Sequence, residues 1–144
     1  MKRRALCIAI VFLFCMPSLV LADWTYIGKS NSAQFYYDKA TMAKTPEGNI
    51  RIWVKRVFTD EGKQDIIKVQ KEEGNSVRGY EALKESREQM EFNCASRLYA
   101  FISINYHNTN GDVLFSKTYA PDWGPVRPGS LVEVVYDDAC KGPK

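Results

Sequence analysis

Downstream of residue 22 the chain contains only two cysteines, Cys94 and Cys140. Residues 1–22 have the features of an export signal, described below. An even number of cysteines in an exported protein indicates a disulfide. Closing the loop of 46 residues between them would stabilise the fold by about 4 kcal/mol in the chain-entropy account. The alternatives are a metal pair or a catalytic thiol. A zinc site needs about four ligands and a catalytic thiol needs a histidine partner, and His107 is the only histidine in the sequence. We therefore predict a structural disulfide.

The N-terminus has the features of an export signal. Residues 2–4 are basic, residues 5–16 form an apolar run, and residues 20–22 place small side chains where a signal peptidase reads them. A membrane anchor is the alternative, but a spanning helix needs about 20 apolar residues. We predict a cleaved signal peptide at residues 1–22 and one domain at residues 23–144, with no transmembrane segment in the mature chain.

Neither early cysteine suits lipid attachment. Cys7 lies too early in the apolar run, and Cys15 follows the bulky Phe14 where a small residue is expected. We therefore expect an exported protein, in the periplasm, in the medium or on the cell surface, that is not a lipoprotein.

Charge and composition argue against a nucleic-acid-binding protein and against a disordered chain. The net charge of +3 arises from the three basic residues of the signal, and the remaining chain has 17 basic and 17 acidic residues. A nucleic-acid-binding protein would keep a basic excess. Hydrophobic residues make up 45% of the chain, which is enough for a packed core and argues against disorder.

Alternation of apolar and polar residues predicts an antiparallel sheet. The clearest strand is 50–58, in which Ile50, Ile52, Val54 and Phe58 face one way and Arg51, Trp53 and Lys55 the other. Further strands are predicted at 24–28, 34–38, 98–106 and 113–119, with a turn at 110–112. In the strand at 98–106 we expect Leu98, Ala100, Ile102, Ile104 and Tyr106 to share one face.

The middle of the chain is less regular. Residues 60–62 (Asp-Glu-Gly) predict a turn, and Ile67 and Val69 a returning strand. The polar stretch 71–88 fits either a short helix capped by Ser76 or a solvated linker.

The C-terminus has a helical period. Ser130 and Glu133 form a capping box, and an apolar stripe follows at positions three and four residues apart: Val132, Val135, Tyr136, Ala139 and Cys140. A short helix needs tertiary support, which burial of this stripe and the predicted disulfide would supply. The fold class is α+β: one small antiparallel β-sheet domain with a C-terminal α-helix tethered to the sheet by a disulfide.

An ordered set of residues resembles a known family. The set is Trp24, Tyr26–Gly28, Tyr36–Asp38, Trp53, Asn93–Ala95, Tyr106, Gly111, Trp123, Pro128–Ser130 and Cys140. Together they resemble the surface-adhesin protein E-like family of Gram-negative bacteria. The resemblance implies a small sheet with a disulfide-tethered helix and a non-enzymatic envelope protein. It also implies binding of host matrix or serum proteins, as in the name-giving member, and self-association as a homodimer.

The residues that we single out for binding are Arg51, Trp53 and Lys55. They mix aromatic and basic groups opposite the apolar face of their strand, and Trp, Tyr and Arg dominate protein interface hot spots. These three side chains could instead form a second core face. Tyr99 and Phe101, on another predicted strand, also lie opposite an apolar set, and for these two we favour core packing over partner recognition. A protein partner, host matrix or envelope, is the leading prediction. Strand addition at a sheet edge and a carrier of a flat ligand such as haem are the alternatives.

Catalytic motifs are absent from the sequence. The one histidine lies at a polar turn, Asp137 and Asp138 diverge on a helix, and no nucleophile elbow or Gly-rich phosphate loop occurs. We therefore predict that the protein is not an enzyme and needs no cofactor or metal.

Overall fold

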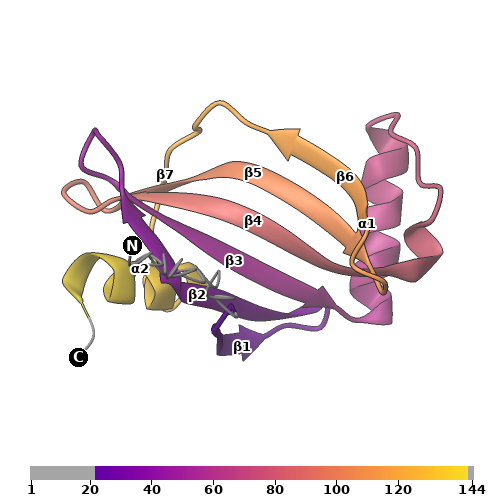
Figure 1. Cartoon of the computed structure of the whole chain (residues 1–144), viewed down its shortest axis with the longest axis horizontal. Helices are drawn as coiled ribbons and strands as arrows, with labels where there is room; N and C mark the ends of the chain where they lie inside the picture. The colour runs from indigo at the N-terminus through magenta and orange to yellow at the C-terminus, as the bar shows by residue number, and fades with distance from the viewer. Residues whose placement is uncertain (1–21, 143–144) are drawn as a thin grey trace, which may run out of the picture.

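The computed structural model describes residues 22–142. They form one antiparallel sheet with a helix at each end (Figure 1). The elements are β1 (Trp24–Lys29), β2 (Ala33–Lys44), β3 (Ile50–Phe58), α1 (Asp60–Glu72), a 3-10 turn (Tyr80–Ala82), β4 (Leu83–Asn93), β5 (Leu98–Asn108), β6 (Val113–Thr118), β7 (Gly124–Pro125) and α2 (Leu131–Lys141). The predicted signal peptide at 1–22 lies, apart from Ala22, outside these residues.

The strands pair in chain order, from β1 through β6, and the short β7 pairs with the start of β5. The predicted fold class, an antiparallel sheet with a disulfide-tethered C-terminal helix, is confirmed. The predicted strand at 50–58 has the predicted bounds, and β6 follows the predicted turn.

Both helices pack on the same face of the sheet, which we call the helix-bearing face. Around α2, the side chains of Ile52, Val54, Phe92 and Val135 belong to one buried cluster. A second cluster lies toward α1 and contains Ala33, Phe58, Tyr80, Leu83, Ile104 and Tyr106. The opposite face has no helix over it among the described residues, and we call it the uncovered face.

The predicted turn at 60–62 and strand around 67–69 are wrong, because residues 60–72 form α1. The helix begins after Thr59, whose side chain accepts a hydrogen bond from the amide of Gly62 at 3.2 Å. Ile66 and Ile67 of this helix pack against the second cluster. The acidic first turn and its glycine look like a surface turn in the sequence, yet acidic residues also suit a helix N-terminus.

The stretch 71–88 is neither a linker nor a helix capped by Ser76. After α1 and the 3-10 turn, β4 begins at Leu83 and pairs with β3 and β5. β4 is a central strand although many of its residues are charged. Its buried carboxylates are tolerated there because each has an arginine partner. These ion pairs are Glu85–Arg87, Glu88–Arg56 and Glu91–Arg51.

The prediction that alternate residues from Leu98 to Tyr106 share a face is also wrong. The register of β4 and β5 shifts between Gln89 and Met90, so that Met90 lies opposite Phe101 while Glu88 lies opposite Ile104. The extra residue in β5 reverses the alternation, as β-bulges do. Tyr99 consequently packs against the first cluster, as we expected for core packing, whereas Phe101 lies 40% exposed.

The capping box of α2 forms, with one change of partner. Ser130 accepts from the amide of Glu133 at 3.2 Å, and the Glu133 carboxylate accepts from the amide of Gly129 at 2.8 Å rather than from that of Ser130. Val135 and Tyr136 are buried, and Val132, Ala139 and Cys140 pack beside them. The predicted apolar stripe therefore faces the sheet.

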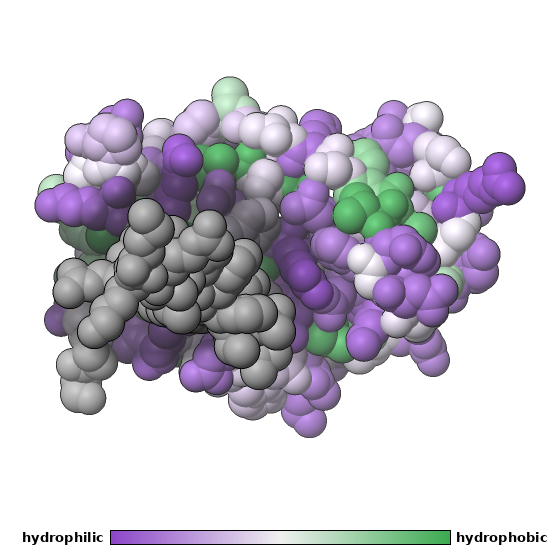
Figure 2. Space-filling view, in the orientation of Figure 1, coloured by the Kyte–Doolittle hydropathy of each residue, from purple (hydrophilic) through white to green (hydrophobic). Residues whose placement is uncertain are grey.

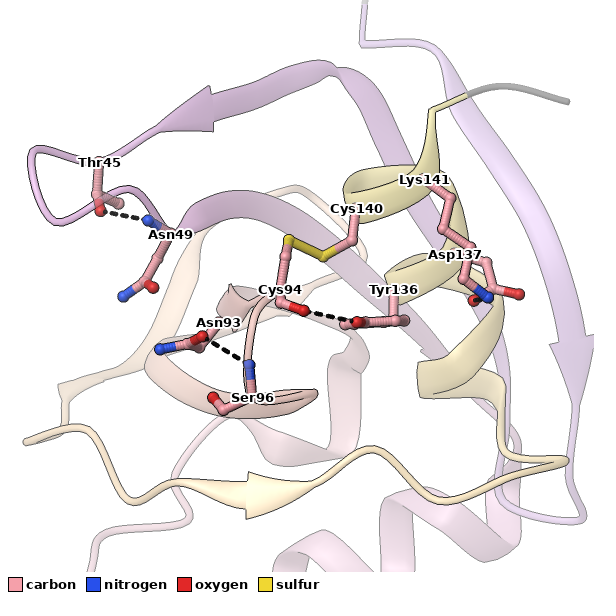
Figure 3. The surroundings of a disulfide bond; sticks show 9 residues. All are labelled: Thr45, Asn49, Asn93, Cys94, Ser96, Tyr136, Asp137, Cys140 and Lys141. Atoms are coloured by element: carbon pink, nitrogen blue, oxygen red, sulfur yellow. Dashed lines mark hydrogen bonds and ion pairs between the residues drawn. A yellow bond between two sulfur atoms is a disulfide. The ribbon is translucent and has the colours of Figure 1, made fainter.

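The predicted disulfide between Cys94 and Cys140 is present, with a Cα–Cα distance of 5.5 Å (Figure 3). Cys94 lies one residue beyond the end of β4, in the turn that leads to β5. Close to the bond, the Tyr136 hydroxyl donates to the carbonyl oxygen of Cys94 at 3.0 Å. Covalent and polar contacts thus hold the last turns of α2 against this turn.

Polar contacts also secure the other side of α2. Asp138 accepts from the Tyr37 hydroxyl and lies 2.6 Å from Lys39 Nζ. The hydrogen bonds from Lys39 and Tyr37 lower the pKa of Asp138. Arg97 forms an ion pair with Glu133 and lies 5.0 Å from the centre of the Tyr136 ring.

Candidate functional site

The uncovered face brings the three predicted binding residues together. Arg51, Trp53 and Lys55 alternate along β3, so all three point away from the helices. The strand register adds neighbours from other strands to this face. They are Trp24, Tyr26, Tyr36, Asp38, Arg87, Gln89, Glu91, Asn105 and His107.

Lys55 lies among aromatic rings. Its Nζ is 4.5 Å from the centre of the Trp24 ring and 4.9 Å from that of Tyr36. Tyr36 in turn makes an edge-to-face contact with Tyr26, which is 53% exposed. Burial by these rings lowers the pKa of Lys55. The lysine and the three rings form what we call the Lys55 cluster.

Arg51 is already engaged within the face. Its Nε lies 2.6 Å from Oε2 of Glu91, and Asn49 donates to the other oxygen of the same carboxylate at 2.7 Å. The Arg51 side chain is 43% exposed, so its outer edge still reaches solvent. A pairing of this kind holds the guanidinium in a fixed orientation.

Trp53 lines a hollow of about 340 Å³ on this face. The other lining residues are Ala22, Trp24, Asp38, Thr41, Arg87, Asn105 and His107. Two indole rings and several polar groups therefore surround one space. The predicted cleavage would remove Ala22 and open this hollow further.

Several residues of the face did not emerge from the sequence as part of a site. Trp24 and Tyr36 reach Lys55 only through the pairing of β1, β2 and β3. His107 was expected in a solvated turn; it lies on β5 beside that turn, with Nδ1 3.2 Å from the carbonyl oxygen of Gly111. Alternation could have indicated which side each residue takes, but not which residues meet across strands.

In the orientation of Figure 1, the described surface is mostly hydrophilic. Figure 2 shows apolar residues on this side gathered in small areas, one of them near the end of the molecule that carries α1.

Among residues 22–142 no group of three or more His, Cys, Asp or Glu side chains is arranged to hold a metal ion. In the same residues, no helix combines the length and apolarity needed to cross a bilayer.

Comparison with known proteins decides the family. Residues 24–141 match the family described as surface-adhesin protein E. The chain belongs to the surface-adhesin protein E family.

The match to surface-adhesin protein E covers every strand and both helices of the described structure. It includes the two cysteines and the whole uncovered face. No curated protein and no solved structure matches the chain. The family membership and the geometry above are therefore what support a functional assignment.

Proposed function

We propose that this protein is an exported, non-enzymatic, adhesin-like envelope protein that binds another protein through its uncovered face. The partner is a host matrix protein or another envelope protein. The membership in the surface-adhesin protein E family supports the adhesin-like role. The observation that carries the choice of face is the Lys55 cluster, where Lys55 lies within 5 Å of two ring centres.

The chemistry of this face fits protein recognition. Trp, Tyr and Arg contribute most to protein interface hot spots, because they bury a large area and keep a polar group. Here Trp53, Tyr36 and Arg51 lie on adjacent strands that the sheet holds rigidly. A partly desolvated lysine beside them has already lost part of its hydration, so a partner's carboxylate can approach at lower cost.

Binding assays with two matched variants test this proposal. The protein is purified after export and incubated with immobilised matrix proteins and with envelope extracts. Trp53→Ala should weaken saturable binding at least tenfold, as truncation of a hot spot of about 2 kcal/mol does. Lys55→Glu should weaken it similarly, whereas Lys68→Glu on α1 makes the same change of charge away from the face and should leave it unchanged. Equal binding by all variants would contradict the choice of face.

Processing and location belong to the same proposal. We propose that residues 1–22 are removed as a signal peptide, that residues 23–144 form the exported domain, and that no lipid is attached. Mass spectrometry of the exported protein would show an N-terminus at Asp23. Fractionation into periplasm, outer membrane and medium would then show which partners the protein meets.

A flat ligand such as haem is the second candidate, favoured by the hollow between Trp24 and Trp53 with His107 on its wall. Indole rings stack on flat aromatic ligands, and cations beside the rings add to binding. Absorbance of the freshly purified protein is the test. The absence of a co-purifying chromophore, together with no spectral shift when haem is added, would eliminate this candidate.

Self-association is a third element of the proposal. β1 and β6 are the edges of the sheet, and unpaired edges can pair with a second copy. Sedimentation equilibrium would reveal a homodimer; a monomer at all concentrations tested would exclude it.

A further inference from the structure

The helix-bearing face contains a half-open cavity of about 480 Å³ between the sheet and α2. Its lining is mostly apolar, from Ile27, Phe35, Tyr36, Val54, Met90, Phe101, Ile104, Leu131, Val132 and Val135. Tyr119, Ala120 and Asp122, in the segment after β6, contribute to the rim. The volume is in the range of pockets that hold small molecules.

A charged pair lies within this apolar lining. Arg56 of β3 and Glu88 of β4 both line the cavity, and their side chains are 29% and 4% exposed. Arg56 Nε lies 2.6 Å from Oε1 of Glu88, and the Ser86 hydroxyl donates to the same oxygen at 2.7 Å. Such a pair loses its hydration on folding and has to recover that free energy from hydrogen bonds.

The pair does not use all its hydrogen-bonding groups within the protein. The contacts of Arg56 in the described structure run from Nε and Nη2, and those of Glu88 are to Oε1. Arg56 Nη1 remains as a donor, and Oε2 of Glu88 as an acceptor. Tyr119 also contributes to the cavity wall, and partial burial raises the pKa of its phenol, which therefore stays neutral.

We propose that this cavity binds a small uncharged amphipathic molecule, whose apolar tail lies against the lining and whose amide or hydroxyl head bonds to Arg56 and Glu88. The tail suits the apolar walls on both sides of the pair. An uncharged head group that both donates and accepts hydrogen bonds suits Arg56 Nη1, a donor, and Oε2 of Glu88, an acceptor. A carboxylate head suits it less, because Glu88 already neutralises Arg56 and would repel a second anion.

The site lies on the other side of the sheet from Lys55 and Trp24, and Tyr36 is the one member of the Lys55 cluster that also lines the cavity. The occupant that we infer is a small molecule rather than a second copy or a peptide strand. The argument rests on the volume of the cavity and on the unused donor and acceptor, which an apolar protein surface would leave unsatisfied.

Calorimetric titration of the exported protein with octanamide, 1-octanol and octanoate tests the proposal. Octanamide and 1-octanol should bind saturably with one site per chain, and octanoate at least tenfold more weakly than octanamide at pH 7. NMR shift changes should occur at Phe101, Ile104 and Val135. No saturable binding, tighter binding of octanoate, or shift changes confined to the uncovered face would overturn the proposal.

Two double variants separate the head-group contact from folding. Arg56→Met with Glu88→Leu replaces the pair by apolar side chains of similar volume, a change that proteins often tolerate. It should weaken octanamide binding at least tenfold. Arg87→Met with Glu85→Leu removes a comparable pair, 2.9 Å apart, from the uncovered face, and should leave octanamide binding unchanged. Equal affinities in the two variants would overturn the role of Arg56 and Glu88.

Discussion

Tyr106 is a polar residue that the second cluster keeps from water. It is 5% exposed, and its ring contacts those of Phe58, Tyr80 and Phe115. Burial, more than any neighbouring charge, raises the pKa of Tyr106 to about 12. A phenolate at this position would be desolvated, so the folded protein holds the proton more tightly than the unfolded chain does.

This pKa predicts a loss of stability at alkaline pH. The contribution of Tyr106 is complete below pH 10, the ordinary pKa of tyrosine, and is lost as the pH rises from there through the folded pKa of about 12. The loss amounts to about 2 kcal/mol by pH 12. Urea unfolding between pH 9 and pH 12 measures it.

Tyr106→Phe should flatten this alkaline decline by about 2 kcal/mol. The matched control is Tyr26→Phe, since Tyr26 is 53% exposed, and it should leave the decline unchanged. An identical pH dependence for Tyr106→Phe and the unchanged protein would contradict the assignment.

Single residues also show what the sequence can predict about a site. Alternation placed Arg51, Trp53 and Lys55 on one face, because side chains of a strand alternate in a regular way. It could not place Trp24 beside Lys55, since that contact depends on the register of three strands. Arg56 interrupts the apolar series of β3, and only the pairing with β4 reveals Glu88 as its partner.

At the scale of elements, α1 depends on a close approach at Gly62. A Cβ at this position would lie 2.0 Å from the backbone carbonyl oxygen of Ser32. The same loop holds the start of the helix, because the amide of Thr59 donates to that oxygen at 2.9 Å. The absence of a side chain therefore lets α1 begin directly against the β1–β2 turn.

Gly62→Ala should destabilise the protein by about 2 kcal/mol or more, because overpacking against backbone forces the helix away. The same substitution inside an unconstrained helix normally stabilises by about 1 kcal/mol. Gly74→Ala is the control: nothing lies within 4 Å, and only its positive φ of 76° opposes alanine, so about 1 kcal/mol is expected. Urea unfolding compares the two. A stabilised Gly62→Ala would refute the close approach.

The tether of α2 gives a further prediction. Replacing Cys94 and Cys140 by alanine opens a loop with a sequence separation of 46 and should lower the free energy of unfolding by about 4 kcal/mol. Reduced unchanged protein should unfold at the same urea concentration as the variant. A midpoint that neither reduction nor substitution shifts would show that the polar contacts hold α2 by themselves.

The two helices differ in how readily the sequence predicts them. α2 has a capping box and an apolar stripe of regular spacing, and both are local signals. α1 contributes few apolar residues to the core, chiefly Ile66 and Ile67, and has a glycine in its first turn. Its helical state depends on Ser32 and on the second cluster, most of which, apart from Phe58, lies outside the neighbouring sequence.

At the scale of the whole molecule, the sheet separates two surfaces of different chemistry. The uncovered face has aromatic and charged groups in contact with solvent, whereas the helix-bearing face contains the mostly apolar cavity. Tyr36 contributes to both surfaces, but Trp53 does not line the cavity and the Arg56–Glu88 pair does not line the hollow at Trp53. We therefore expect changes at Trp53, or at Arg56 and Glu88, to leave binding at the other face unaffected, because residues without common partners behave additively.

Trp53→Ala should leave the octanamide affinity within twofold of its original value, and Arg56→Met with Glu88→Leu should leave protein-partner binding within the same limit. Calorimetry and the immobilised-partner assay provide the two measurements. A loss of tenfold or more at the distant face in either variant would show that the sheet couples the two surfaces.

The order of the strands has a consequence for how the protein matures. Since β1 to β6 pair with their neighbours in the chain, most strand pairs close over short turns, and only β3 and β4 are separated by α1 and the 3-10 turn. The sheet can therefore assemble while the chain is still emerging from export. β7 must return to the start of β5, and α2 must return across the sequence to meet Cys94. When an oxidant of the export compartment takes two electrons and two protons from Cys94 and Cys140, the disulfide that forms marks a completed molecule. A chain cut short before its last helix keeps a reactive sulfhydryl that distinguishes it from the finished one.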